Sequence, residues 1–189
     1  MVFIRDTELA LRATVALVNT LPRHDSADLD GLATQADLTA YLTRFPYTGA
    51  VRRDDEELAA VRANRPRLRA LWDVDRGGAV PLVNAMLRDG HALPQLVIHD
   101  GYDWHIHATG ETAPLATRML VEAAMAFVEV IRSDRWDRVR ICAADDCDAV
   151  YIDYSKNGSK RYCDTGNCGN RMNVNAYRQR RVRQARGSG

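Results

Sequence analysis

The chain has 189 residues, of which 26 are Lys or Arg and 25 are Asp or Glu, so its formal net charge at pH 7 is +1. This balance excludes a uniformly basic polyanion-binding protein, and the length is sufficient for a sizeable core. No segment has the apolar character of a signal peptide or a membrane span, so we expect a cytoplasmic protein without membrane contact.

Charge is distributed unevenly along the chain. From residue 135 onward there are 12 Lys and Arg against 6 Asp and Glu, whereas the preceding residues hold 14 against 19. Residues 165–189 contain no acidic residue. This asymmetry predicts a nucleic-acid-facing C-terminal end on an acidic N-terminal body.

The first part of the chain predicts helices. Residues 6–20 place apolar side chains at helical spacing. Residues 23–28 are polar and predict a loop. Residues 34–44 repeat the helical pattern, with Leu38 and Tyr41 on the apolar stripe, and we expect both to be core residues.

A third helix is predicted from the acidic residues 54–57, which favour the positive end of a helix dipole, to Trp72. Pro66 lies inside it and is expected to kink or split the helix near Asn64. The helix also carries a basic run, which we expect to be a solvated face neutralised by the upstream acids rather than a second nucleic-acid patch. The run consists of Arg62, Arg65, Arg67 and Arg69.

After Trp72 the spacing of the apolar residues changes, first to another helix and then to the alternation of strands. Gly77 and Gly78 are predicted to interrupt the pattern before a fourth helix over 81–87. Residues 93–99 and 104–108 then alternate as strands do, and the turn residues between them predict a β-hairpin.

His105 and His107 lie two residues apart and therefore on one face of the second strand. A metal site is conceivable there, but the sequence places no third ligand beside them. We expect an exposed or hydrogen-bonded strand face.

Residues 112–132 carry the clearest helical pattern and predict the central core helix. A short linker containing Trp136 follows, so we expect the C-terminal segment to pack on the body. The predicted domains are residues 1–133, mostly helical with one hairpin, and residues 134–189. The body is expected to hold a small-molecule effector site or a homodimer interface, with Trp72, Tyr102 and Trp104 as candidates.

All four cysteines lie in the C-terminal segment, in the pattern C-x4-C-x15-C-x4-C: Cys142, Cys147, Cys163 and Cys168. Two short-spaced pairs can supply four thiolates at tetrahedral angles, the donor set of a structural zinc ion. Two disulfides are the alternative, but a reducing cytosol favours metal ligation. A closed four-thiolate site leaves no position for substrate, so we expect one structural zinc per chain and no enzymatic activity.

Between the cysteine pairs, alternation over 150–154, an Asn-Gly turn at 157–158 and a return strand over 160–163 predict a second hairpin. A basic helix over 170–186 follows. A hairpin and a helix around four cysteines describe a treble-clef-like zinc finger. The predicted fold is therefore mainly α, with one small hairpin in the body, plus this finger.

The last cysteine opens a short motif with characteristic flanks: Lys160-Arg161-Tyr162-Cys163, then Cys168-Gly169-Asn170-Arg171, then Val174, Tyr177 and Arg178. This stretch resembles the CGNR zinc finger family over roughly residues 140–181. In that family the finger follows a larger domain called ABATE, and residues 15–20 are similar to the opening apolar segment of that domain. The resemblance implies a stress-induced transcription regulator.

On a helical wheel, the C-terminal helix is predicted to cover the zinc site with Val174 and Tyr177 and to turn its arginines outward. Asn170 and Arg171 are expected to support the metal ligands, Arg171 by pairing with Asp153 or a backbone carbonyl. The residues expected to contact nucleic acid are Lys156, Lys160, Arg161, Arg178, Gln179, Arg180, Arg183 and Arg186.

Two classes of function remain open. The first is a DNA-binding regulator whose body senses a ligand or dimerises, with RNA binding as a variant. The second is a protein-interaction adaptor in which the finger is purely structural. Salt-dependent binding to duplex DNA distinguishes them, because neutralising phosphates releases counterions.

Overall fold

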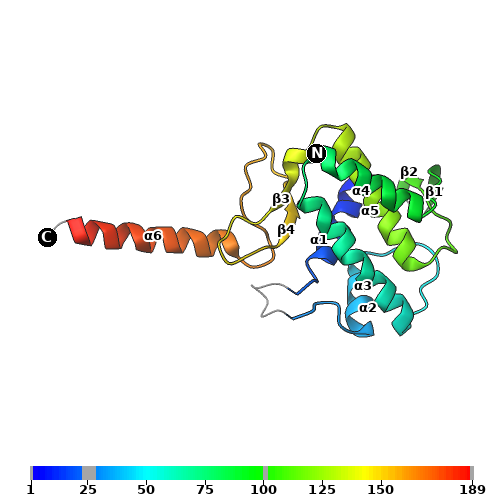
Figure 1. Cartoon of the computed structure of the whole chain (residues 1–189), viewed down its shortest axis with the longest axis horizontal. Coiled ribbons are helices and arrows are strands. Elements are labelled where there is room, and N and C mark those ends of the chain that lie inside the picture. Colours follow the sequence, from blue (N-terminus) through cyan, green and yellow to red (C-terminus); the bar gives the residue numbers. More distant parts are fainter. Residues whose placement is uncertain (1, 23–28, 100–101, 188–189) are drawn as a thin grey trace.

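A computed structural model describes residues 2–22, 29–99 and 102–187. The molecule is elongated: a helical body lies at one end, the cysteine-rich finger follows it, and helix α6 extends away from both (Figure 1). The predicted loop over 23–28 and the tip of the predicted hairpin lie outside the described residues. The mainly helical architecture confirms the predicted fold class.

The body is built around α5 (Leu115–Arg132), the predicted central helix. Three helices pack directly against it: α1 (Arg5–Val18), α3 (Asp55–Arg69) and α4 (Arg76–Asp89). The helix α2 (Gln35–Arg44) packs on α3. Phe127 of α5 is fully buried, and its ring meets that of Trp72 edge-on at 5.3 Å between centroids.

Side chains set the starts of the helices. The hydroxyl of Thr34 accepts a hydrogen bond from the backbone of Asp37, whose carboxylate in turn accepts from the backbone of Thr34. Asp54 caps α3 by accepting from the backbone N–H of Glu57. Caps of this kind stabilise a helix by about 0.5–2 kcal/mol.

Of the predicted kink or split of the third helix near Asn64, the split does not occur, because α3 continues through Pro66. Proline cannot donate to the carbonyl of Arg62 four residues earlier. That carbonyl instead accepts a bond from Nε of Arg65 at 3.4 Å. A side chain thus replaces the missing backbone donor and the helix survives.

The predicted start of the fourth helix at residue 81 is also wrong, because α4 begins at Arg76 and includes both glycines. Asp75 accepts a hydrogen bond from the N–H of Gly78 at 2.7 Å. This cap compensates for the low helix propensity of glycine in the first turn.

The basic run of α3 is neutralised, but by different acids from those predicted. Arg65 is buried, and two of its nitrogens donate to Asp30 at 2.6 and 2.9 Å. Arg62 reaches the same carboxylate at 2.9 Å. The hydrogen bond from Arg65 holds the pKa of Asp30 well below its usual range. The other ion pairs of the run are Arg67–Asp89 and Arg69–Asp73.

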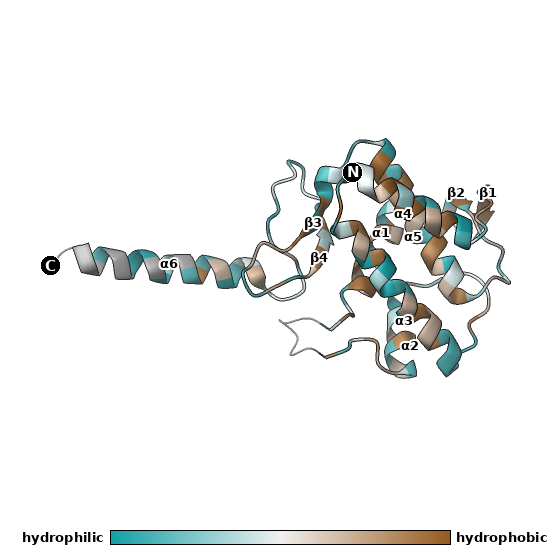
Figure 2. Cartoon of the chain, viewed as in Figure 1, coloured by the Kyte–Doolittle hydropathy of each residue, from teal (hydrophilic) through white to brown (hydrophobic). Residues whose placement is uncertain are grey.

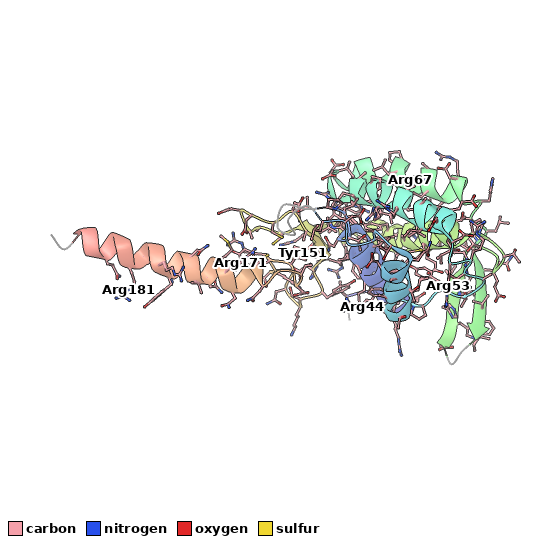
Figure 3. The ribbon with its side chains drawn as sticks, turned by 90° about the horizontal axis from the view of Figure 1, so that it is seen from below. Arg44, Arg53, Arg67, Tyr151, Arg171 and Arg181 are labelled. Atoms are coloured by element: carbon pink, nitrogen blue, oxygen red, sulfur yellow. The ribbon has the colours of Figure 1, made fainter. Side chains whose placement is uncertain are left out.

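The predicted body hairpin is confirmed as β1 (Gln95–His99) and β2 (Tyr102–His107), which pair antiparallel. It lies at the opposite end of the molecule from α6 (Figure 1) and projects from the helices (Figure 3). One of its faces is apolar and exposed. Brown segments in both strands mark hydrophobic residues in Figure 2. That face consists of Leu96, Ile98, Trp104 and Ile106, which are 46–66% exposed.

The finger contains a hairpin, but its strands are not the predicted ones. β4 (Val150–Ile152) pairs antiparallel with the preceding β3 (Val139–Ile141) rather than with residues 160–163. The backbone of 160–163 is instead tied to its surroundings by other contacts. The carbonyl of Lys160 accepts from the Tyr151 hydroxyl at 2.7 Å, and that of Arg161 accepts from the N–H of Ala143 at 2.9 Å.

The strand β4 is shared between two cores. Val150 and Ile152 are buried in the core of the body, whereas Tyr151 is buried among the cysteines. The body also reaches the backbone of β4: the indole N–H of Trp72 donates to the carbonyl of Tyr151 at 3.2 Å. Trp72 is therefore a joint between body and finger, not the lining of a ligand pocket.

Asn19 completes this joint. Its amide donates to the carbonyl of Val150 at 2.8 Å and accepts from the N–H of the same residue at 2.9 Å, as a neighbouring strand would. Thr20, the next residue, also has a structural role, because its carbonyl and its hydroxyl both accept hydrogen bonds from Nη1 of Arg65.

Replacing Asn19 with Ala is expected to lower the free energy of unfolding by about 1–3 kcal/mol, because both backbone groups of Val150 lose their partner in a buried place. Urea unfolding followed by circular dichroism measures this. Asn173→Ala, at an exposed position of α6, is the matched control and should stay within about 0.5 kcal/mol of wild type. Equal stabilities of the two variants would contradict the role given to Asn19.

Candidate metal centre and nucleic-acid interface

The four cysteines converge on one point. Their sulfurs all lie within 4.8 Å of one another. The separation is 3.7 Å between Cys147 and Cys163 and 3.6 Å between Cys163 and Cys168. Tetrahedral zinc with Zn–S bonds of about 2.3 Å requires sulfurs about 3.8 Å apart, whereas a disulfide requires about 2.05 Å. The arrangement fits a four-thiolate zinc site and not the alternative of two disulfides.

Different elements deliver the ligands. Cys142 follows β3, and Cys147 lies in the turn before β4, with its N–H donating to the carbonyl of Ala144. Cys163 lies in the loop after the hairpin and donates its N–H to the sulfur of Cys142 at 3.4 Å. Cys168 is the first residue of α6, where the helix dipole favours a thiolate.

The surroundings shift the pKa values of two of the thiols in opposite directions. Burial raises the pKa of Cys168 to about 11. Burial also opposes charge on Cys163, but backbone N–H groups of Thr165 and Gly166 help to hold its pKa below the ordinary value. A bound zinc ion deprotonates all four thiols, so one structural zinc closes the site.

The turn between the cysteine pairs is built around a buried carboxylate and a buried guanidinium. Burial opposes the charge of Asp153, yet bonds from Ser155 and Lys160 and the charge of Arg138 hold its pKa below the usual value. Arg138 donates to the carbonyls of Asp153 and Ser155. Gly158 adopts a φ of 61° beside the Arg138 side chain, as the predicted Asn-Gly turn requires.

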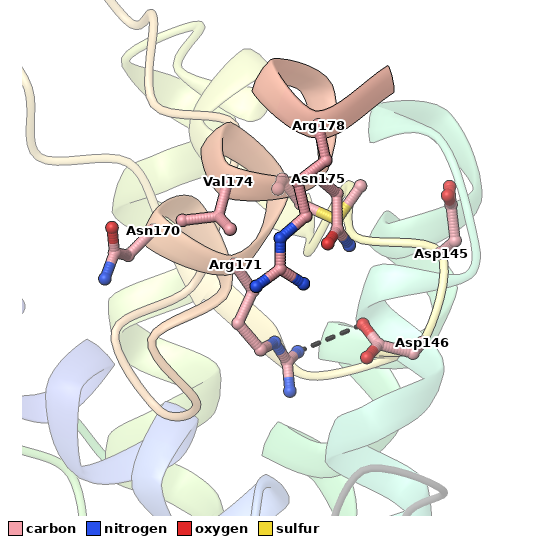
Figure 4. Close-up of a pocket in the computed structure, with 8 residues that line it drawn as sticks. Asp145, Asp146, Asn170, Arg171, Val174, Asn175 and Arg178 are labelled. Atoms are coloured by element: carbon pink, nitrogen blue, oxygen red, sulfur yellow. Dashed lines mark hydrogen bonds and ion pairs between the residues drawn. The ribbon is translucent and has the colours of Figure 1, made fainter. Parts of the chain in front are cut away.

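Arg171 lies beside the cysteines, and its carboxylate partner is not the predicted one. Its Nη2 lies 3.2 Å from the sulfur of Cys168 and donates to Asp146 at 3.0 Å, the contact drawn in Figure 4. Asp153 is not its partner, because that carboxylate is occupied by the turn. Asn170 is exposed and points away from Asp146, so it is available to a partner molecule (Figure 4).

A hollow of about 430 Å³ lies beside this ion pair, between the first cysteine turn and α6 (Figure 4). Two carboxylates, two guanidiniums, two amides and two apolar side chains line it: Asp145, Asp146, Asn170, Arg171, Met172, Val174, Asn175 and Arg178.

The prediction that Val174 and Tyr177 cover the zinc site is wrong. They are 40% and 55% exposed. The metal ligand Cys168 fixes the rotation of α6, and therefore Arg171 and Met172, three and four residues later, face the finger. Val174 and Tyr177 consequently face solvent, and beyond its first turns α6 (Cys168–Gly187) projects free of the body (Figure 1).

The structure places the predicted nucleic-acid contacts in two groups. On the turn, Lys156 and Arg161 are exposed, whereas Lys160 pairs with Asp164. On α6, Arg178 and Arg180 are exposed. The side chains of Gln179, Arg183 and Arg186 lie outside the described ones, although their backbone belongs to α6. Sequence reasoning missed Arg181, which is exposed on the free part of the helix (Figure 3).

The body offers less to a ligand. Of the predicted candidates, Trp72 is buried in the core and Trp104 is 64% exposed, while the side chain of Tyr102 is outside the described ones. A hollow of about 290 Å³ lies between α2 and the segment that follows it, lined in part by Tyr47 and Arg53.

Within the described part of the chain, no helix combines the length and apolarity needed to span a bilayer.

Two protein-family models match the chain. Residues 11–134 match ABATE, described as "Putative stress-induced transcription regulator". Residues 138–181 match the CGNR zinc finger. No curated protein matches the chain. The two matched ranges correspond to the helical body and to the cysteine-rich finger.

Purified protein is expected to contain about one zinc ion per chain by elemental analysis, and a strong chelator should remove it. Hydrogen exchange should then rise over residues 142–175, because the cysteine core has few other apolar contacts, while α5 stays protected. Added zinc restores protection in wild type but not in Cys163→Ser. A metal-free wild type with full protection of residues 142–175 would rule the zinc site out.

Proposed function

Because the chain belongs to the ABATE family and carries a CGNR zinc finger, we propose that it is a DNA-binding transcription regulator whose finger presents α6 to the duplex. The main support for the proposal is that α6 is basic and projects away from the body. The role is non-enzymatic, and four reduced thiolates suit the reducing cytoplasm.

Dimensions support this role for α6. A helix of 20 residues is about 30 Å long, and only its first turns pack on the finger. The major groove of B-DNA is wide enough to accept an α-helix. Residues 165–189 contain no acid that could neutralise the arginines of the helix from within. In the body, by contrast, Arg62, Arg65, Arg67 and Arg69 are already paired with carboxylates.

The chemistry of one stripe of α6 suits contact with base edges. Asn170, Val174, Tyr177 and Arg181 follow at spacings of four, three and four residues, and all are exposed. Asn pairs well with adenine, Arg with guanine, and an apolar side chain with the methyl group of thymine. On a helical wheel of the sequence, Arg180, Arg183 and Arg186 fall on a different side from that stripe, and guanidiniums suit phosphates.

Replacing Arg180, Arg183 and Arg186 together with Ala is expected to reduce the magnitude of the log–log salt slope of DNA binding by about three, one for each lost phosphate contact. Arg181→Ala should instead cost about 1–3 kcal/mol at one base position and relax the preference there. Fluorescence anisotropy with duplex DNA over a salt series measures both.

Alanine preserves helicity, so a loss of affinity cannot be attributed to melting of α6. The matched control replaces three exposed arginines of the body, Arg44, Arg88 and Arg132, and removes the same charge from outside α6. Equal salt slopes for the two triple variants would reject DNA contact by α6 and favour the adaptor function. Stronger binding to RNA than to duplex DNA would favour the RNA variant.

We also propose that the body dimerises through the apolar face of β1–β2. The four side chains of that face carry no charge, so the face is complementary to a second copy of itself, as a two-fold interface requires. Neither strand carries the lysines or prolines that usually protect a sheet edge.

Sedimentation equilibrium is expected to detect a dimer of the full chain and a monomer for Trp104→Glu, because a buried, unpaired carboxylate opposes association. Leu29→Glu introduces the same charge at another exposed apolar residue, 71% exposed, and should remain dimeric. A wild type that sediments as a monomer would refute the dimer.

A further inference from the structure

The β1–β2 hairpin carries two histidines in close contact on the face opposite its exposed apolar face. His105 and His107 alternate with the exposed apolar residues along β2 and are half-buried. Their Nε2 atoms lie 3.1 Å apart, with the ring planes inclined at 70°. The contact joins residues two apart on one strand, so the backbone itself holds the rings together.

The other nitrogen of His105 fixes its tautomer. Nδ1 lies 2.8 Å from the carbonyl oxygen of Asp103. A carbonyl oxygen only accepts hydrogen bonds, so Nδ1 is the nitrogen that carries the proton. In the neutral ring, Nε2 then presents its lone pair toward His107. Histidines that bind metals are held in this way, with the remote N–H donated to a backbone carbonyl or a carboxylate.

The separation of the two Nε2 atoms matches that of two ligands on one ion. With metal–nitrogen bonds of about 2.0–2.1 Å, neighbouring ligands lie about 2.9 Å apart at 90° and about 3.4 Å apart at the tetrahedral angle. The observed 3.1 Å falls between these values. Little rearrangement is therefore needed for both nitrogens to bind one ion.

We propose that His105 and His107 form a second metal site, distinct from the finger, for a divalent ion that prefers imidazole. Zn²⁺, Ni²⁺ and Cu²⁺ have this preference, whereas Mg²⁺ and Ca²⁺ prefer oxygen ligands. Two imidazoles hold an ion less tightly than four thiolates do, so this ion is expected to exchange more readily than the zinc of the finger. The site does not depend on the proposed function in DNA binding.

The test uses the full chain with its finger zinc in place, dialysed against increasing free Zn²⁺, with bound metal measured by elemental analysis. Wild type is expected to bind about one further equivalent beyond the structural ion. His105→Gln and His107→Gln should each weaken binding of that second equivalent at least about tenfold, since losing even a residue that only orients a metal ligand has an effect of this size. Both variants should retain the first equivalent.

His91→Asn is the matched control. His91 is exposed outside the hairpin, and its φ of 48° is one that asparagine tolerates. This variant should bind the second equivalent like wild type. In parallel, nitrogen NMR of the wild-type histidines should record a zinc-induced shift at Nε2 of His105 and His107.

Two outcomes overturn the proposal. One is a wild type that binds only one zinc ion per chain at every zinc concentration, in which case the Nε2 contact is only a hydrogen bond. The other is a second equivalent that both Gln variants hold as tightly as wild type, in which case the ion binds elsewhere.

Discussion

The alternation of side chains along β4 is the constraint on which the rest of the structure depends. Val150 and Ile152 point into the body core, and Tyr151 points into the cysteine core. Asn19 and Trp72 bond to the backbone of the strand from the body side. Three residues therefore serve two cores at once, and the finger cannot swing on its linker without exposing buried apolar surface. The metal site and the body are mechanically joined, and the direction in which α6 leaves the molecule follows from this joint.

The body differs in its charges from the finger and α6. In the body, the arginines of α3 are matched with carboxylates, and the buried Arg65 depends on Asp30 for its charge partner. In the finger, four thiolates around zinc carry a net charge of −2, which Arg171 partly offsets at the sulfur of Cys168. Beyond that point α6 has exposed guanidiniums and no acidic residues. A near-neutral chain thus has one strongly basic end, where long-range attraction to a polyanion is concentrated.

The β1–β2 hairpin lies at the far end from α6 and has two chemically different faces (Figure 1). Its position depends on the packing of α4 against α5, which Gly90 permits, because a Cβ there would collide with Val121. A two-stranded ribbon is marginally stable by itself in water. Contacts on either face, with a second copy or with a metal ion, would therefore add to the order of the hairpin as well as to association.

The sequence by itself determined the features that depend on local spacing. The cysteine pattern predicted the zinc site, period 3.6 predicted α5, and alternation predicted the β1–β2 hairpin. Tertiary structure decided what depends on partners distant in sequence. Strand β4 could not be paired correctly from the sequence, because its neighbours are β3 and Asn19 rather than the residues that follow it. The face of α6 could not be assigned either, because its rotation is fixed by the bond of Cys168 to the metal and not by the small apolar stripe of Val174 and Tyr177, which tertiary packing leaves in solvent.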